Sequence, residues 1–105
     1  MPFVPRGFIN QREIAQGVER AANALARTVV RIRYDFGEDW TGEPSIFFRI
    51  VLTDEAVKQS KLNEIANTIT DILAREVNAD EMGLHSYFNF RSATEQAQLR
   101  EPTWA

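Results

Sequence analysis

The spacing of apolar residues switches along this chain between a helical period and a strand period, and this switching limits the fold more than any other feature. A buried face recurs about every 3.6 residues in a helix and about every two residues in a strand. Helical spacing covers residues 11–27 and residues 61–77, while alternation covers residues 28–36, 45–53 and 84–91. The order therefore predicts helix, strand, strand, helix and strand.

Both predicted long helices have one apolar stripe. The first stripe consists of Ile14, Val18, Ala21 and Leu25, and the second of Leu62, Ile65, Ile69, Ile72, Leu73 and Val77. Gly17 lies inside the first helix, where glycine costs about 1 kcal/mol relative to alanine. We therefore predict that Gly17 allows close packing on a neighbouring element.

Each predicted strand has one strongly apolar face. Its members are Val30, Ile32, Tyr34 and Phe36 in the first strand, Ile46, Phe48, Ile50 and Leu52 in the second, and Leu84, Ser86, Phe88 and Phe90 in the third. The composition of residues 37–44 predicts a turn, so the first two strands should pair as an antiparallel hairpin. Residues 54–59 fit either a loop or an early helical turn.

A short helix is predicted after the third strand. Ser92 and Glu95 match the S-x-x-E capping box, and Pro102 prevents the helix from continuing. The resulting α-β-β-α-β-α order predicts an α+β fold, a two-layer sandwich with both long helices on one face of a three-stranded sheet. The length of 105 residues suits a single domain over residues 1–105, with an irregular lead-in at residues 1–9 and a tail at residues 101–105.

The composition narrows the class of protein. The absence of cysteine excludes disulfide scaffolds, thiolate zinc sites and cysteine nucleophiles, and it favours a reducing compartment. No apolar run reaches the length of a signal peptide or a membrane span, so we expect a cytoplasmic protein that does not contact membranes. The net charge of −3 argues against simple electrostatic binding of nucleic acid.

Known catalytic motifs are missing from the sequence, which has no Walker loop, dinucleotide-binding glycine motif, nucleophile elbow or zinc signature. His85 is the only histidine, so one chain cannot form a histidine cluster. The predicted turn and its flank carry four carboxylates, at Asp35, Glu38, Asp39 and Glu43, but their spacing does not match a calcium-binding loop. We expect a non-catalytic protein with no cofactor and no bound metal.

The second face of the predicted sheet mixes guanidinium groups with aromatic rings. Its candidate binding residues are Arg31, Arg33, Phe47, Arg49, Tyr87 and Arg91, and Val51, His85 and Asn89 share the face. Arginine and aromatic side chains are enriched at protein interfaces, so we expect a protein partner or self-association, with a homodimer as the favoured form. The alternatives are stacking on a nucleic acid, a small anionic ligand, or a face that is solvated or covered by the C-terminal helix.

Two tryptophans are candidate contact anchors. Trp40 lies in the polar turn and Trp104 lies near the end of the chain. A tryptophan in either place packs on its own domain or anchors a partner. We therefore expect a small interaction module, with a nucleic-acid-binding domain as the alternative.

Two families offer fold-level resemblances. The α-β-β-α-β order resembles KH-type domains, and the face that carries arginines and rings resembles RNA-recognition-motif domains. Both resemblances imply binding of nucleic acid. The G-x-x-G loop of the first family and the aromatic signature of the second are absent from this sequence.

Overall fold

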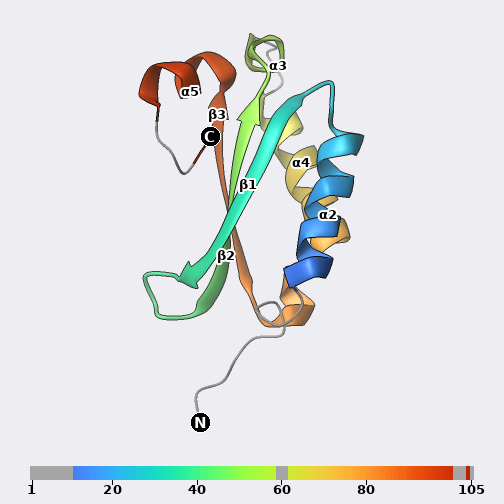
Figure 1. Cartoon of the computed structure of the whole chain (residues 1–105), viewed down its shortest axis with the longest axis vertical. Helices are drawn as coiled ribbons and strands as arrows, with labels where there is room; N and C mark the ends of the chain where they lie inside the picture. Colours follow the sequence, from blue (N-terminus) through green and yellow to red (C-terminus); the bar gives the residue numbers. More distant parts are fainter. Residues whose placement is uncertain (1–10, 59–61, 101–103, 105) are drawn as a thin grey trace.

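Two helices with one apolar stripe each need a shared apolar surface, and a three-stranded sheet supplies it (Figure 1). The computed structural model describes residues 11–58, 62–100 and 104. Its elements are α2 (Gln11–Ala24), β1 (Val29–Glu38), β2 (Pro44–Leu52), α3 (Asp54–Lys58), α4 (Leu62–Val77), the 3-10 helix η1 (Ala79–Met82), β3 (His85–Ser92) and α5 (Ala93–Leu99). This order confirms the predicted α+β class and the α-β-β-α-β-α sequence of elements.

The sheet is mixed, which the sequence did not reveal. Its strands lie in the order β1-β2-β3, with β1 antiparallel to β2 and β2 parallel to β3. The predicted hairpin is therefore confirmed, and its loop is residues 39–43. A parallel neighbour needs a long crossover, and α3 and α4 form that connection between β2 and β3.

The core lies between the central strand and the two long helices, which run side by side on one face of the sheet in Figure 1. The inward side chains of β2 are fully buried: Ile46, Phe48, Ile50 and Leu52 are at most 2% exposed. Four members of the first predicted stripe, Ile14, Val18, Ala21 and Leu25, are buried as expected. In the second stripe Ile69, Leu73 and Val77 are buried, Ile65 and Ile72 are partly buried, and Leu62 is 43% exposed.

Gly17 brings α2 close to the end of α4. A Cβ at this position would lie 2.5 Å from the carbonyl oxygen of Glu76, closer than such atoms can approach. The prediction that Gly17 serves close packing is confirmed, because only glycine leaves room for the α4 backbone.

The predicted orientation of Val30 is wrong. Val29 pairs with Leu52 and Arg31 pairs with Val51, so Val30 is an extra residue in the β1 ladder. Such a bulge breaks the two-residue alternation. As a result Val29 is buried in the core, while Val30 is 49% exposed.

The capping box at the start of α5 is present as predicted. The Glu95 backbone N–H donates to the Ser92 hydroxyl at 3.0 Å, and the Ser92 N–H donates to the Glu95 carboxylate at 3.3 Å. Thr94 ties the same turn to the start of α3, because its backbone N–H and its hydroxyl both donate to Asp54, at 3.0 and 2.6 Å. These bonds place α5 on the side of the sheet opposite α2 and α4 (Figure 1).

Some predictions concern residues that the structure does not describe. The lead-in at residues 1–9 and all of the tail at residues 101–105 except Trp104 lie outside the described residues. The organisation of residues 1–105 as one domain stays a prediction. In the described part of the chain, no helix combines the length and the apolar character needed to cross a membrane.

Candidate contact surface on the outer face of the sheet

We call the side of the sheet that faces away from α2 and α4 the outer face. Cross-strand pairing arranges its side chains in rows of three, one from each strand. The rows are Arg31–Val51–Arg91, Arg33–Arg49–Asn89, Asp35–Phe47–Tyr87 and Gly37–Ser45–His85. The six candidate sheet residues predicted from the sequence therefore occupy three consecutive rows.

The first row is covered by the C-terminal segment. The Arg31 Nε–H donates to the Trp104 carbonyl at 2.9 Å, and the Arg91 guanidinium lies 4.2 Å from the centre of the Trp104 ring. Val51, between these arginines, is 1% exposed although it does not belong to the main core. Trp104 itself is 6% exposed, so this end of the outer face is closed to solvent.

This burial bears on two alternatives that the sequence left open. Val51 is not part of an open face, because it is only 1% exposed. Trp104 packs on its own domain, where its ring gains a cation–π contact and its carbonyl gains a donor. Arg31 and Arg91 are thereby engaged in holding the C-terminal segment.

The next two rows carry a pair of stacked rings beside a salt bridge. The rings of Phe47 and Tyr87 lie 5.4 Å apart and within 17° of parallel. An Arg49 nitrogen lies 2.8 Å from an Asp35 carboxylate oxygen, and the exposed Arg33 is opposite Arg49 in the ladder. Asp35 therefore balances the charge of Arg49 within the sheet.

Asp39 organises the hairpin loop. One of its oxygens accepts from the Thr41 N–H at 2.9 Å, the Thr41 hydroxyl at 2.6 Å and the Glu43 N–H at 3.0 Å. Its other oxygen accepts from the Tyr87 hydroxyl at 2.7 Å, which fixes the loop over the outer face. Gly42 completes the turn with φ of 83°, a value that favours glycine.

These hydrogen bonds shift two pKa values in opposite directions. Donation by the Thr41 and Tyr87 side chains and by two backbone N–H groups holds the pKa of Asp39 well below its usual range. The hydrogen bond to Asp39, with smaller contributions from desolvation and from the negative charge, raises the pKa of Tyr87. At neutral pH Asp39 is ionised and Tyr87 is protonated, so this pair suits positioning rather than proton transfer.

Trp40 stands at the tip of this fixed loop and is 90% exposed. A hollow of about 300 Å³ lies beneath it, lined by Glu38, Asp39, Trp40, Phe47, Tyr87, Phe88 and Asn89. We call Arg33, Trp40, Phe47, Arg49 and Tyr87 the aromatic–arginine surface. It combines three rings and two guanidinium groups beside an acidic loop.

The role of Asp39 was missed from the sequence, where it counted only as one of four acidic residues. The signal that could have identified it is the Asp39-x-Thr41-Gly42 pattern, which is typical of a side-chain-capped turn. The bond to Tyr87 had no sequence signal, because the two residues are 48 positions apart.

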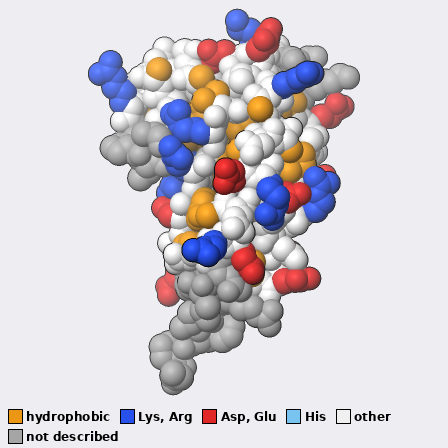
Figure 2. All heavy atoms as spheres, turned by 45° about the vertical axis from the view of Figure 1, so that its right-hand side comes forward, with side chains coloured by type: hydrophobic (Ala, Val, Ile, Leu, Met, Phe, Trp, Pro, Cys, Tyr) orange, Lys and Arg blue, Asp and Glu red, His pale blue; other side chains and the backbone are white. Residues whose placement is uncertain are grey.

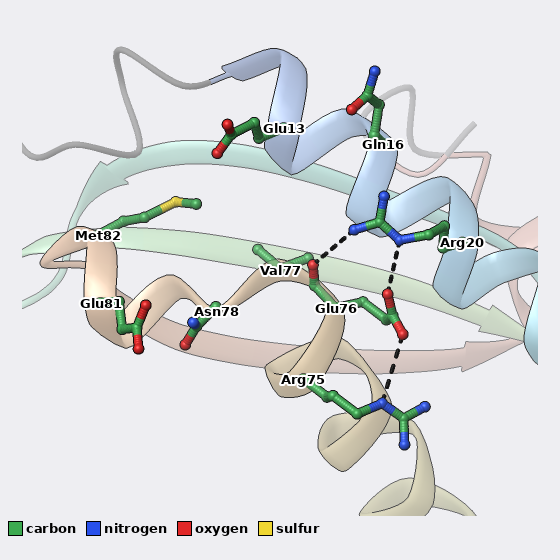
Figure 3. Close-up of a pocket in the computed structure, with 9 residues that line it drawn as sticks. All are labelled: Glu13, Gln16, Arg20, Arg75, Glu76, Val77, Asn78, Glu81 and Met82. Carbon is green, nitrogen blue, oxygen red and sulfur yellow. Dashed lines mark hydrogen bonds and ion pairs between the residues drawn. The ribbon is translucent and has the colours of Figure 1, made fainter.

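A larger hollow, of about 470 Å³, lies between α2 and the end of α4 (Figure 3). There Arg20 reaches across from α2, and its Nε–H donates to the Glu76 carboxylate at 2.8 Å. Arg75 approaches the other Glu76 oxygen at 3.5 Å. The Arg20 hydrogen bond is the main cause that lowers the pKa of Glu76. Since Arg20 of α2 and Glu76 of α4 form an ion pair, we interpret this group as a clamp between the two helices.

On the side that carries α2 and α4, the described residues present charges of both signs. Figure 2 brings this side forward and shows basic and acidic side chains interspersed, with apolar atoms between them. Among the described residues, no three His, Asp or Glu side chains gather in a way that could hold a metal ion.

The chain was compared with models of protein families, with curated proteins and with solved structures, and no match was found in any of the three.

Proposed function

We propose that this chain is a small, non-catalytic protein-interaction module that binds a partner protein through the aromatic–arginine surface, with Trp40 as the anchor. The observation that carries the proposal is the 90% exposure of Trp40 on a loop whose shape is fixed by Asp39. Tryptophan, tyrosine and arginine dominate the binding energy of protein interfaces. A loop that is already ordered loses less conformational entropy on binding.

The chemistry of the surface also supports a protein partner. The Phe47–Tyr87 stack provides a flat apolar floor, and the Arg49–Asp35 pair provides polar groups at its edge. An apolar centre with a mixed polar rim is the usual anatomy of a protein interface. We further propose that the module works in the cytoplasm, in keeping with its lack of cysteine.

The test compares partners retained by matched variants of the full chain. The immobilised wild type, Trp40→Ala and Leu99→Ala are exposed to extract of the source cells, and bound proteins are quantified by mass spectrometry. Leu99 is the control, because it is 52% exposed but lies on α5, away from the stacked rings. We expect a partner that the wild type and Leu99→Ala retain and that Trp40→Ala loses by about tenfold or more, a change of 1.4 kcal/mol.

Self-association through the same surface is read separately by light scattering of the purified variants. The proposal is wrong if Trp40→Ala retains the same proteins as the wild type and also self-associates to the same extent as the wild type.

A second candidate function is binding of single-stranded nucleic acid. It is supported by the stacked Phe47 and Tyr87 rings beside Arg33 and Arg49, since bases stack on aromatic rings and guanidinium groups pair with phosphates. Anisotropy titrations with short labelled RNA and DNA at low salt test it. Binding that weakens steeply with salt and is lost in Phe47→Ala supports this function, and absence of binding at low salt removes it.

A further inference from the structure

The two edges of the sheet differ in how they are protected. On β1 the bulge at Val30 and the charged residues Arg31, Arg33 and Asp35 interrupt the edge. Bulges and charges are the devices by which proteins prevent edge strands from pairing with other chains. The middle of β3, residues 86–90, has no charge, no proline and no bulge.

The outer edge of β3 is open within the described part of the chain. β3 is the last strand in the sheet order, and no described segment donates or accepts a backbone hydrogen bond at residues 85–90 from that side. An open row of N–H and C=O groups is a template for a further strand.

Hollows flank this edge on the side of the helices. One of about 460 Å³ adjoins Ser86 and Phe88 near the start of β3, and one of about 250 Å³ adjoins Phe90 near its end. Phe88 and Phe90 are only partly buried against the core. The small Ser86 side chain leaves space near the start of β3, and the Phe90 ring lies near its end.

We propose that β3 pairs in antiparallel fashion with β3 of a second copy of this chain, forming one continuous sheet across a two-fold axis near Phe88. A two-fold interface must be self-complementary. With Phe88 at the axis, Phe90 of one copy lies opposite Ser86 of the other, so each copy supplies both a ring and the space for it. The paired segments carry no like charges in their centre, and this favours a second copy as the occupant.

This pairing has a consequence for the outer face. The two-fold axis would be perpendicular to the sheet, so both outer faces would lie on the same side of the joined sheet. Two aromatic–arginine surfaces would then be presented together, and the dimer could bind a two-fold partner with added avidity. The dimer itself does not depend on the proposed function, because Trp40 and Phe47 lie outside the β3 edge.

Engineered cysteines can test the seam, because the natural sequence contains none. Asn89→Cys places an exposed thiol on β3, and Val30→Cys places one on the β1 edge as the matched control. We expect a short bis-maleimide to link Asn89→Cys into covalent dimers in high yield and to leave Val30→Cys largely monomeric.

Light scattering of the full chain over a range of concentrations provides the second arm. We expect a dimer in the wild type and in Val30→Lys. Ser86→Lys should weaken dimerisation by about tenfold or more, because it places a charge beside the partner's Phe90. Circular dichroism checks that each variant is folded.

Three outcomes overturn the proposal: a wild type that stays monomeric up to millimolar concentration, a dimer that cross-links through Val30→Cys rather than Asn89→Cys, or a folded Ser86→Lys variant that dimerises as the wild type does. Retention of the dimer in Trp40→Ala would separate this interface from the proposed contact surface.

Discussion

The Tyr87 hydroxyl donates a hydrogen bond of 2.7 Å to the Asp39 carboxylate and so joins the last strand to the loop between the first two. This bond determines where Trp40 stands, because Asp39 also holds the backbone of the loop through Thr41 and Glu43. Trp40 and the stacked rings of Phe47 and Tyr87 are therefore linked through Asp39.

The first prediction concerns stability in acid. The folded-state pKa of Asp39 is depressed below its unfolded value, so ionised Asp39 stabilises the fold at neutral pH. This stabilisation must be lost as the pH falls below the unfolded value of about 3.9. Asp39→Asn should be less stable than the wild type at pH 7, and the difference should shrink below about pH 4. Urea unfolding at several pH values measures it.

The control for this prediction changes Tyr87, which donates the hydrogen bond to Asp39. Tyr87→Phe removes the same hydrogen bond and leaves the ring stack with Phe47 intact. In the double variant the two losses should be less than additive, because both changes remove one shared bond. Full additivity would show that the bond does not form in solution.

The second prediction concerns Trp104. Trp104 is 6% exposed, and the Arg91 guanidinium lies over its ring. Trp104→Ala should lower the free energy of unfolding by about 3 kcal/mol, the lower end for loss of a buried aromatic side chain. Trp104→Phe keeps a ring over Arg91 and should recover most of the loss. Urea denaturation measures these free energies of unfolding. Equal stability of the wild type and Trp104→Ala would contradict the burial of the Trp104 ring.

The third prediction concerns Trp40. Its indole is 90% exposed, so Trp40→Ala should change the free energy of unfolding by less than about 0.5 kcal/mol. Its fluorescence should be typical of a ring in water, whereas Trp104 should emit at shorter wavelength. The Trp40→Phe and Trp104→Phe variants isolate the two emissions. A blue-shifted emission from Trp40 in the free monomer would show that the anchor is already covered.

The fourth prediction concerns Gly17. Alanine is the better helix former by about 1 kcal/mol, so Gly17→Ala would stabilise an isolated helix. In this fold the new methyl group would lie 2.5 Å from the Glu76 carbonyl oxygen and force α2 away from α4. We expect net destabilisation of about 1–3 kcal/mol, the range for overpacking. Thermal unfolding measures it, with Gln16→Ala on the exposed side of the same helix as control.

The sequence correctly predicted the elements in which the spacing of apolar residues matches the face that is buried in the structure. The stripe of Ile14, Val18 and Ala21 needs one buried helical face, and the alternation of Ile46, Phe48 and Ile50 needs one buried strand face. Val30 was misplaced because a bulge adds one residue without changing the composition of the strand. The Ser92–Glu95 cap was predictable, because all its bonds lie within one turn.

By itself the sequence determined the order and type of the elements and the side chains that can share a face, since these depend on local periodicity and on near neighbours in the chain. Only the tertiary structure decided that β3 lies parallel to β2, that Trp104 packs against Arg91, and that Tyr87 holds Asp39. Each of these contacts joins residues far apart in sequence. Their free energy depends on how helices and strands fit together in space, and no local pattern of residues encodes that fit.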